Sequence, residues 1–305
     1  MSTVSDHSTR NAHLPLGAGS DFYASLFARD DAGIQAAANV PVASLWIGDT
    51  LRDLEKLCLR SFTHQGHPVT LFHTHPLEDP KLEGVTLRPA RDVFQYEDSL
   101  LEQTAPAVFA DLFRLRMVRD TDLTWVDTDI ICLKPFVTQD GYLVGFESET
   151  TVNNAVLRLP ADSEALNALI EIFSEPSFVP PWLKQHDADY VNKLPPEQRL
   201  LGSAKRVPNA FGPHAITWAL KLTGEIEHAL PHDYLNPVAW PMADIYFNPY
   251  GGLEGWLTEN TMGVHMYSSR VRALHKRTPP YAGSFIANVA TEVGFDFGGR
   301  PFKQA

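Results

Sequence analysis

The sequence predicts an α/β fold built on a mostly parallel sheet with helices on both faces. Between residues 41 and 160, apolar segments of strand length alternate with segments of helical periodicity. This alternation is typical of parallel sheets, because parallel strands are usually joined by crossover helices. Beyond Pro160 the prolines are closely spaced and the end of the chain is aromatic, so we expect an irregular second half that completes a cleft.

Each element is predicted from its periodicity and its flanking residues. Residues 1–39 have weak periodicity, and we interpret them as an N-terminal extension with one short helix. Strands are expected in the apolar runs 41–48, 67–75, 83–90, 122–133, 141–147 and 153–160. Helices are expected at about 51–66, 106–119 and 162–173, and after Gly212-Pro213, because proline is tolerated in a first helical turn. The prolines between 176 and 196 predict irregular connections.

Composition and charge narrow the possible functions. The 305 residues carry a formal net charge of −12, which argues against nucleic acid or an anionic membrane as partner. No apolar run could span a bilayer and no secretory signal is visible, so we expect a cytoplasmic protein that at most contacts the inner membrane face. Cys58 and Cys132 sit in apolar patterns and are expected to be buried thiols. An acidic protein that binds a phosphorylated ligand needs local positive charge, and a bound cation is the simplest source.

Paired carboxylates provide the strongest functional signal. The Asp-x-Asp triplet occurs three times, and we interpret two of these, at residues 120–122 and 187–189, as ordinary turn or helix-cap residues. Only Asp127 and Asp129 lie between apolar strand-like segments, where burying carboxylates costs several kcal/mol unless something compensates. In an extended backbone the two side chains would point the same way. Oxygen ligands suit Mg²⁺ or Mn²⁺, so the sequence predicts a divalent metal site, with solvated aspartates as the alternative.

The segment WVDTDIICLKPF, residues 125–136, resembles the Asp-x-Asp segment of retaining GT-A glycosyltransferases of family 32, the sugar-binding group containing DXD. That group includes bacterial capsular-polysaccharide enzymes, and α1,4-galactosyltransferases are relatives. The resemblance extends from about Leu45 to Tyr267, with motifs in the expected order: WIG, FADLFR, DTD, NNAVL, FGPHAIT and VHMYS. It implies a single GT-A-like domain over residues 40–305, in which 40–160 bind the nucleotide sugar and 161–305 lie on the acceptor side.

The resemblance implies that Asp127, Asp129 and His265 hold the metal ion, with Tyr267 and Ser268 near the donor phosphates. A structural role is the alternative for His265, as for any single histidine. Two departures from the family pattern concern this region. The family usually has Gly-Gly before the strand that leads to Asp-x-Asp, where this chain has DTDLTW, and a tryptophan often stands where this chain has Tyr267.

The donor sugar and base have their own set of implied contacts. Trp46 matches a position near the uracil ring, with a core tryptophan as the alternative reading. Asp111 and Arg114 match a pair that contacts sugar hydroxyls, and their spacing puts both on one helical face, as it would for a surface ion pair. The family usually has serine directly before this aspartate, where the chain has alanine. Asn153 and Asn154 match an asparagine pair beside the sugar, with a turn as the alternative.

On the acceptor side, the resemblance implies that Gly212 and Pro213 open a helix beside the cleft and that His214 faces it. Glu147, at the end of a predicted strand, is a candidate catalytic carboxylate together with Asn154, and a solvated surface carboxylate is its alternative. The implied activity is metal-dependent transfer of a sugar, with retention of configuration, from a UDP-sugar to a saccharide or other hydroxyl acceptor. Two alternatives remain open: a haloacid-dehalogenase-like phosphatase, which also uses Asp-x-Asp, and a non-catalytic carbohydrate-binding relative.

Overall fold

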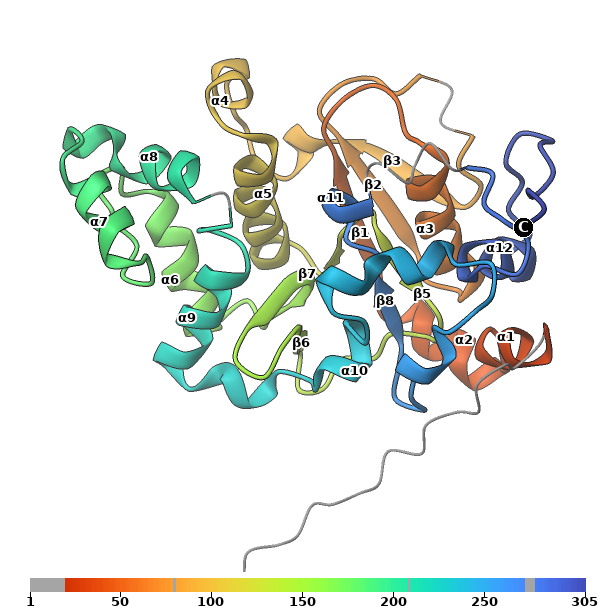
Figure 1. Ribbon diagram of the computed structural model, residues 1–305. Coiled ribbons are helices and arrows are strands. Elements are labelled where there is room, and N and C mark those ends of the chain that lie inside the picture. The colour runs from red at the N-terminus through yellow and green to blue at the C-terminus, as the bar shows by residue number, and fades with distance from the viewer. Residues whose placement is uncertain (1–19, 79–80, 208, 272–277) are drawn as a thin grey trace, which may run out of the picture.

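The computed structural model describes residues 20–78, 81–207, 209–271 and 278–305 and has an α/β fold around a six-stranded sheet (Figure 1). The strand order is β3-β2-β1-β4-β7-β6. The strands are β1 (Val42–Trp46), β2 (Val69–His73), β3 (Val85–Pro89), β4 (Thr124–Val126), β6 (Leu143–Phe146) and β7 (Val152–Arg158). Neighbours from β3 to β4 are parallel, whereas β7 is antiparallel to both β4 and β6. The predicted α/β class with a mostly parallel sheet is confirmed.

The reversed direction of β7 decides which residues meet at one edge of the sheet. Val126, the last residue of β4, pairs with Val156, so the first residues of β7 extend beyond the carboxyl end of β4. Phe146, the last residue of β6, pairs with Val152 at the start of β7. The ends of β4 and β6 and the start of β7 therefore share one edge, which in open α/β sheets is the usual place for a ligand.

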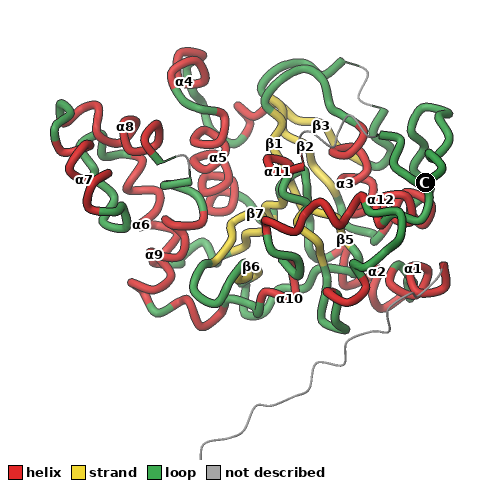
Figure 2. Tube along the Cα trace, viewed as in Figure 1, coloured by secondary structure: helices red, strands yellow, loops and turns green. Residues whose placement is uncertain are grey.

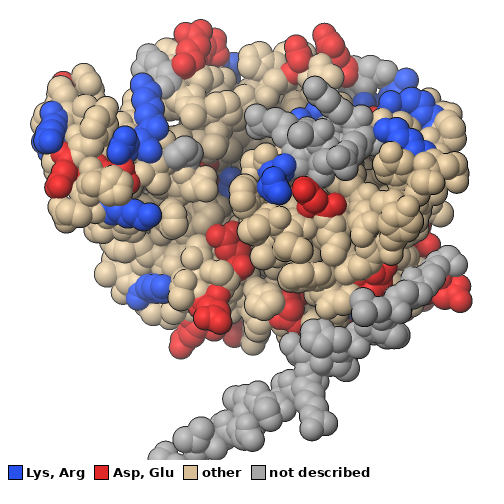
Figure 3. Space-filling model, viewed as in Figure 1, with Lys and Arg blue, Asp and Glu red and all other residues tan. Residues whose placement is uncertain are grey.

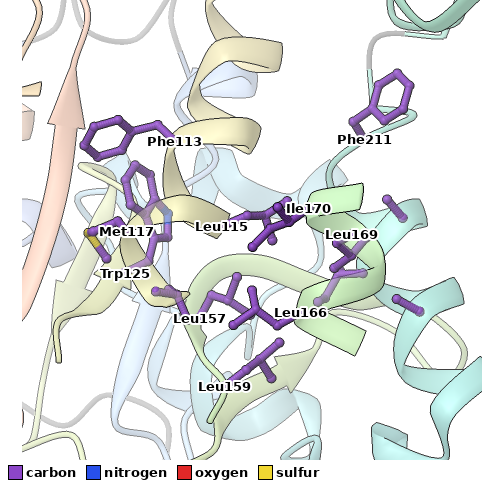
Figure 4. Packing of buried hydrophobic residues seen from close by; sticks show 14 of the residues in the cluster. Phe113, Leu115, Met117, Trp125, Leu157, Leu159, Leu166, Leu169, Ile170 and Phe211 are labelled. Carbon is purple, nitrogen blue, oxygen red and sulfur yellow. The ribbon is translucent and has the colours of Figure 1, made fainter. Parts of the chain in front are cut away.

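Helices cover both faces of this sheet. One face packs against α3 (Asp53–His64), and the other against α5 (Pro106–Asp120), α6 (Glu164–Phe173) and α9 (Pro213–Thr223). Trp125 and Leu157 point toward α5 and α6 (Figure 4), whereas the adjacent Val126 and Val156 belong to the apolar cluster on the α3 side. Successive residues of a strand point to opposite faces, so a sheet covered on both sides needs continuous apolar strands such as these.

A second, two-stranded sheet connects the edge of the main sheet to the C-terminal half. Its strands, β5 (Ile130–Cys132) and β8 (Gly263–His265), are antiparallel, and Ile130 pairs with His265. The two apolar strand-like segments that flank the triplet, LTWV and IICL, therefore belong to two different sheets. Because only three residues separate the end of β4 from the start of β5, the Asp-x-Asp triplet forms the junction between these sheets.

The segment before residue 40 contains two helices, α1 (Ser20–Leu26) and α2 (Asp31–Ala38), where the sequence predicts one. Both are short, so their periodicity is weak, but Asp30 caps α2 by accepting a hydrogen bond from the Gly33 amide. Tyr23 and Phe27 are buried in a cluster with α12 (Phe285–Glu292). Residues 20–38 are thus packed onto the fold rather than simply appended to it, and residues 1–19 lie outside the described part.

The C-terminal half is more helical than its prolines suggest. One helix, α7 (Gln185–Asn192), lies where irregular connections were expected, and a second, α8 (Arg199–Arg206), follows soon after it. That expectation was wrong because the prolines at 180, 181, 195 and 196 flank α7 without interrupting it. In the part of the chain that follows α9, loops and short helical turns predominate, as expected (Figure 2). The remaining elements are η1 (Ala90–Asp92), α4 (Asp98–Gln103), η2 (Pro196–Gln198), η3 (Glu225–His228), α10 (His232–Leu235), η4 (Trp240–Phe247), η5 (Glu254–Trp256) and α11 (Ser268–Val271).

Two further expectations concern the chain as a whole. Within the described ranges, no helix combines the length and the apolar character needed to cross a bilayer. Cys58 and Cys132 are buried free thiols, as predicted, and burial raises the pKa of both well above its ordinary value. Although the chain carries a net charge of −12, the face shown in Figure 3 has groups of Lys and Arg side chains over α7 and α8 and also at the upper right of the view.

Candidate functional site

The Asp-x-Asp triplet forms a tight turn between β4 and β5. The Ile130 amide donates to the Asp127 carbonyl at 3.2 Å, which closes the turn. The Asp127 amide donates to the Ala155 carbonyl of β7 at 2.7 Å, and the Met266 amide donates to the Asp129 carbonyl at 2.9 Å. The extended backbone that the sequence suggested is therefore wrong, because the chain must turn here to pass from one sheet to the other. Backbone hydrogen bonds from two distant segments hold both ends of the turn.

Three potential metal ligands converge at this turn. Asp127, Asp129 and His265 each offer one ligand atom, and these atoms lie within 4.8 Å of one another. Nε2 of His265 is 3.5 Å from Oδ1 of Asp129, and the Ser268 amide donates to Oδ2 of Asp129 at 2.7 Å. Tyr267, whose φ of 51° is unusual for a residue other than glycine, stacks its ring on the His265 imidazole at 4.0 Å. The strained backbone at Tyr267 lies where the chain bends between two residues that contact Asp129.

The residues present fit a hard divalent cation. Two carboxylates and an imidazole are a donor set that Mn²⁺ accepts well, and Mg²⁺ also favours the carboxylates. His265 is buried, and its Nδ1 has no hydrogen-bond partner within the described ranges. A buried imidazole with an unpaired nitrogen is costly, and an ion held at the ring is one way to offset that cost. Either Mn²⁺ or Mg²⁺ therefore suits this cluster.

The acidity of the cluster is set by burial and by close charges. Burial and the neighbouring Asp129 charge raise the pKa of Asp127, against the opposing influence of Arg114. Burial would also raise the pKa of Asp129, but His265 and the hydrogen bonds from Ser268 outweigh it and lower this pKa to about 2. For His265 the Asp129 charge outweighs burial and raises the pKa. These contacts therefore favour the ionised form of Asp129.

A buried polar network connects α5 to the start of β7 beside the cluster. Nη1 of Arg114 donates to the Asn154 carbonyl at 2.6 Å, and Nη2 lies 3.5 Å from Oδ1 of Asp111 and 3.4 Å from Oδ1 of Asp127. The Asn154 amide group donates to Oδ1 of Asp111 at 3.1 Å. Burial raises the pKa of Asp111 to about 6, although Arg114 and Asn154 oppose this. Because Asp111 and Arg114 are both buried, they do not form the surface ion pair that was the alternative.

A second carboxylate is held at the same edge of the sheet. Glu147 directly follows β6, and its Oε2 accepts a hydrogen bond of 2.6 Å from the Asn153 side chain. Oδ1 of Asn153 in turn accepts from the Ala155 amide at 2.7 Å, which fixes the orientation of the side chain. Asn153 and Asn154 lie in β7 itself, so the turn that was their alternative is excluded. Glu147 is partly buried and oriented by a hydrogen bond rather than freely solvated.

One cavity of about 590 Å³ collects most of these side chains, a volume in the usual range for small-molecule sites. Twelve of the fourteen candidate residues line it: Asp111, Arg114, Asp127, Asp129, Glu147, Asn153, Asn154, Gly212, Pro213, His214, His265 and Tyr267. Ser268 does not line the cavity, because its amide points to Asp129. The cavity lining also contains residues that the sequence did not indicate, namely Ala107, Ser148, Asn209, Ala239, Trp240, Pro241 and Ser269.

The remaining predicted donor residue, Trp46, lies at the carboxyl end of β1 but does not line the cavity. Its ring is partly buried, the Arg52 guanidinium lies 6.0 Å from the ring centroid, and its Nε1 has no hydrogen-bond partner among the described residues. β1 is the parallel neighbour of β4, so Trp46 stands at the same edge of the sheet as the metal cluster. Its contact with a uracil ring stays a prediction.

The start of α9 forms the wall of the cavity that adjoins β7 and the polar network. Gly212 precedes Pro213, the first residue of the helix, and a Cβ added at Gly212 would lie 3.5 Å from both Oδ1 of Asn154 and Oδ1 of Asp111. The helix therefore begins in direct contact with the buried polar network. His214, the next residue, is exposed and lines the cavity.

Trp240 is the most informative of the residues that sequence reasoning missed. The only local signal was a Trp-Pro pair in an aromatic, irregular segment, and nothing in that pattern connects it to residues more than one hundred positions earlier.

Comparisons of the chain with protein-family models, curated proteins and solved structures find no match. The function therefore has to be inferred from the geometry of the cavity.

Proposed function

We propose that the protein is a metal-dependent glycosyltransferase that transfers a sugar, with retention of configuration, from a nucleotide-sugar donor such as a UDP-sugar to a hydroxyl acceptor. The observation that carries this proposal is that one cavity is lined by both a candidate metal site and a buried polar network. Asp127, Asp129 and His265 form a divalent-metal donor set, and the buried network around Asp111 and Arg114 lies directly beside it. The sheet order with a reversed β7, and the β5–β8 pair, are compatible with a GT-A-like fold.

The metal cluster supports binding of a diphosphate. A divalent ion held by Asp127, Asp129 and His265 would supply positive charge to stabilise the negative charge that grows on a departing nucleoside diphosphate. The protein contributes the fixed positions of these ligands. The Ser268 amide orients the Asp129 carboxylate, and the indole Nε1 of Trp125 donates to Oδ1 of Asp127 at 2.7 Å. Such supporting hydrogen bonds hold metal ligands in place and tune their affinity.

The polar network supports recognition of the donor sugar. Asp111, Arg114 and Asn154 orient one another through hydrogen bonds and close ion contacts, and all three line the cavity. Carboxylate, guanidinium and amide groups together can accept from and donate to sugar hydroxyls. Since the network is already formed, little side-chain entropy is lost when a sugar binds.

The position of the Glu147 carboxylate supports a role in the proposed sugar transfer. The Asn153 side chain holds its carboxylate, which lines the same cavity as the metal cluster. Positive charge develops at the anomeric carbon as the bond to the diphosphate breaks, and a fixed carboxylate stabilises such charge. The phosphatase alternative has less support, because the described lining of the cavity contains no lysine and its Asp-x-Asp follows the fourth strand of the chain rather than the first.

The proposal is tested by binding and by donor hydrolysis. We expect UDP to raise the thermal unfolding midpoint only when Mn²⁺ or Mg²⁺ is present, because ligands of the native state add to its stability. Slow hydrolysis of UDP-glucose, UDP-galactose or UDP-N-acetylglucosamine should appear under the same conditions and stop in excess EDTA. Metal-independent hydrolysis of a simple phosphate monoester would instead favour the phosphatase. Stabilisation by UDP without any hydrolysis or transfer would point to the non-catalytic relative.

A further inference from the structure

A half-exposed tryptophan stands at the cavity, apart from the residues assigned above. Trp240 is the first residue of η4, and it lines the cavity together with Ala239 and Pro241. The donor-side network comes from α5 and β7, whereas this segment belongs to the C-terminal part of the chain, near α11 (Figure 1). The cavity therefore has a wall that the metal cluster and the polar network do not explain.

The exposure of Trp240 distinguishes it from the other large apolar side chains. Nine such side chains are exposed within the described ranges, and Trp240, at 51%, is the one among them that lines this cavity. Large aromatic groups are usually buried or sit at binding surfaces, since exposure of their area to water is unfavourable. A tryptophan left half in water at the mouth of a ligand cavity is therefore a candidate binding surface.

The Trp240 ring is also held in position. The Arg270 guanidinium lies over it, 5.6 Å from the ring centroid, which is within cation–π range. Nη2 of Arg270 lies 3.4 Å from Oδ2 of Asp244, one turn further along η4. The ring and its cation are thus connected through the same short helix, which restricts the rotamers of both. A restricted aromatic surface binds a flat ligand with less loss of entropy than a freely moving one.

The side chains that line the cavity with Trp240 indicate which class of ligand the indole would bind. An indole face suits a pyranose ring, because the C–H groups on one side of a sugar form a flat apolar patch. Hydroxyl, amide and imidazole groups of the same cavity can bind the sugar hydroxyls: Ser148, Asn209, His214 and Ser269. The cavity also contains four carboxylates, at residues 111, 127, 129 and 147, which disfavours a second anionic ligand beside a metal-bound diphosphate.

We infer that Trp240 is the acceptor platform and that the acceptor is a neutral saccharide whose terminal ring stacks on the indole. This inference rests on the proposed function, since it concerns the second substrate of the same cavity. It predicts that sugar specificity on the acceptor side depends on η4 and on the Arg270–Asp244 pair that supports it. An acidic acceptor is disfavoured by the carboxylates of the same cavity.

Saturation-transfer NMR with lactose, maltose and cellobiose, in the presence of UDP and Mg²⁺, tests the inference directly. At least one of these neutral disaccharides should receive saturation on its ring protons from the wild-type protein. Trp240→Ala should weaken that binding about fivefold to tenfold, and Trp240→Phe should recover much of it, because a smaller aromatic face remains. Trp256→Ala is the matched control, since Trp256 is partly exposed but does not line the cavity, and it should leave sugar binding unchanged.

Three results would overturn the inference. These are no saturation of any of the three sugars, equal saturation in wild type and Trp240→Ala, and a loss of UDP–Mg²⁺ stabilisation in Trp240→Ala that would assign the ring to the nucleotide. Failure of the proposed function is distinguishable, because it would appear in the wild-type protein as absence of UDP–Mg²⁺ stabilisation. Thermal unfolding of each variant without ligand establishes that it is folded, and Trp240→Phe serves if the alanine variant is not.

Discussion

Two Asp-x-Asp triplets of this chain have nearly the same composition and opposite structural outcomes. Asp127 and Asp129 flank a threonine in the turn between two sheets, and both carboxylates line the cavity. Asp187 and Asp189 flank an alanine in α7, away from that cavity. Two residues two positions apart in a helix point about 200° away from each other. The backbone conformation therefore decides whether this motif can gather its carboxylates around one ion.

The partners of the two triplets differ as much as their backbones. Oδ1 of Asp187 accepts from Arg206 at 2.7 Å, and Oδ1 of Asp189 accepts from Gln185 at 2.8 Å. Each helical aspartate thus has a protein partner of ordinary strength. Asp129 is oriented by a backbone amide and lies beside a histidine, but no lysine or arginine of the described ranges forms an ion pair with it. A carboxylate supported in this way still lacks the full positive charge that an ion would bring.

The largest expected effect distinguishes the triplets directly. Asp129→Ala should reduce metal-dependent donor hydrolysis by about 10³-fold, equivalent to roughly 4 kcal/mol of transition-state stabilisation, because a metal ligand is removed. It should also abolish the Mn²⁺-dependent thermal shift with UDP. Asp189→Ala, at an exposed position of the other triplet, is the control and should change neither. Full activity of Asp129→Ala would show that the turn between the sheets does not hold the ion.

A smaller effect should separate the sugar network from the metal cluster. Asp111→Ala removes the acceptor that Asn154 and Arg114 share, and the unpaired groups left behind should cost about 1–3 kcal/mol of affinity for a nucleotide sugar. Binding of bare UDP should weaken much less. Calorimetric titration with UDP and with UDP-glucose measures this difference. Equal weakening of both ligands would mean that Asp111 supports the fold or the phosphates instead.

The smallest expected effect concerns the helical triplet. Asp187→Ala breaks the pair with Arg206, which is itself partly exposed, so unfolding in urea should show a loss of about 1 kcal/mol. Asp189→Ala should stay within about 0.5 kcal/mol of the wild type. Neither change should alter the response to UDP and Mn²⁺. A metal-dependent effect at Asp187 would remove the distinction between the two triplets.

The sequence predicted the elements of the sheet better than their arrangement. The strands around Leu71, Trp125 and Leu157 were recognisable because a sheet covered on both faces requires continuous apolar runs. The direction of β7 was not predictable, since hydrophobic pattern carries no information on whether a strand runs parallel or antiparallel to its neighbour. The residues of α7 were missed because prolines outside a helix resemble prolines that would break one.

The residues of the candidate site also differ in whether the sequence could predict them. Asp127 and Asp129 stood out because apolar flanks made their burial costly without a cation, an argument that requires only local sequence. The turn that aims them could not be predicted, because it exists only where the two sheets meet. His265 and Asp111 could be connected to the site only through a family resemblance, since both approach it from distant segments. Trp240 had neither a local nor a family signal, and exposure in three dimensions alone reveals it.

The hydrogen bond between the Ser268 amide and the Asp129 carboxylate joins residues 139 positions apart, and this separation has a consequence during synthesis. Chains emerge from the ribosome with the N-terminus first, so β1 to β7 are available long before β8. Until β8 leaves the exit tunnel and pairs with β5, the nascent chain has its aspartates but lacks the histidine and the amide beside them. The candidate metal cluster is therefore among the last parts of the molecule to be completed, and a translation product truncated before β8 would lack one of its three potential ligands.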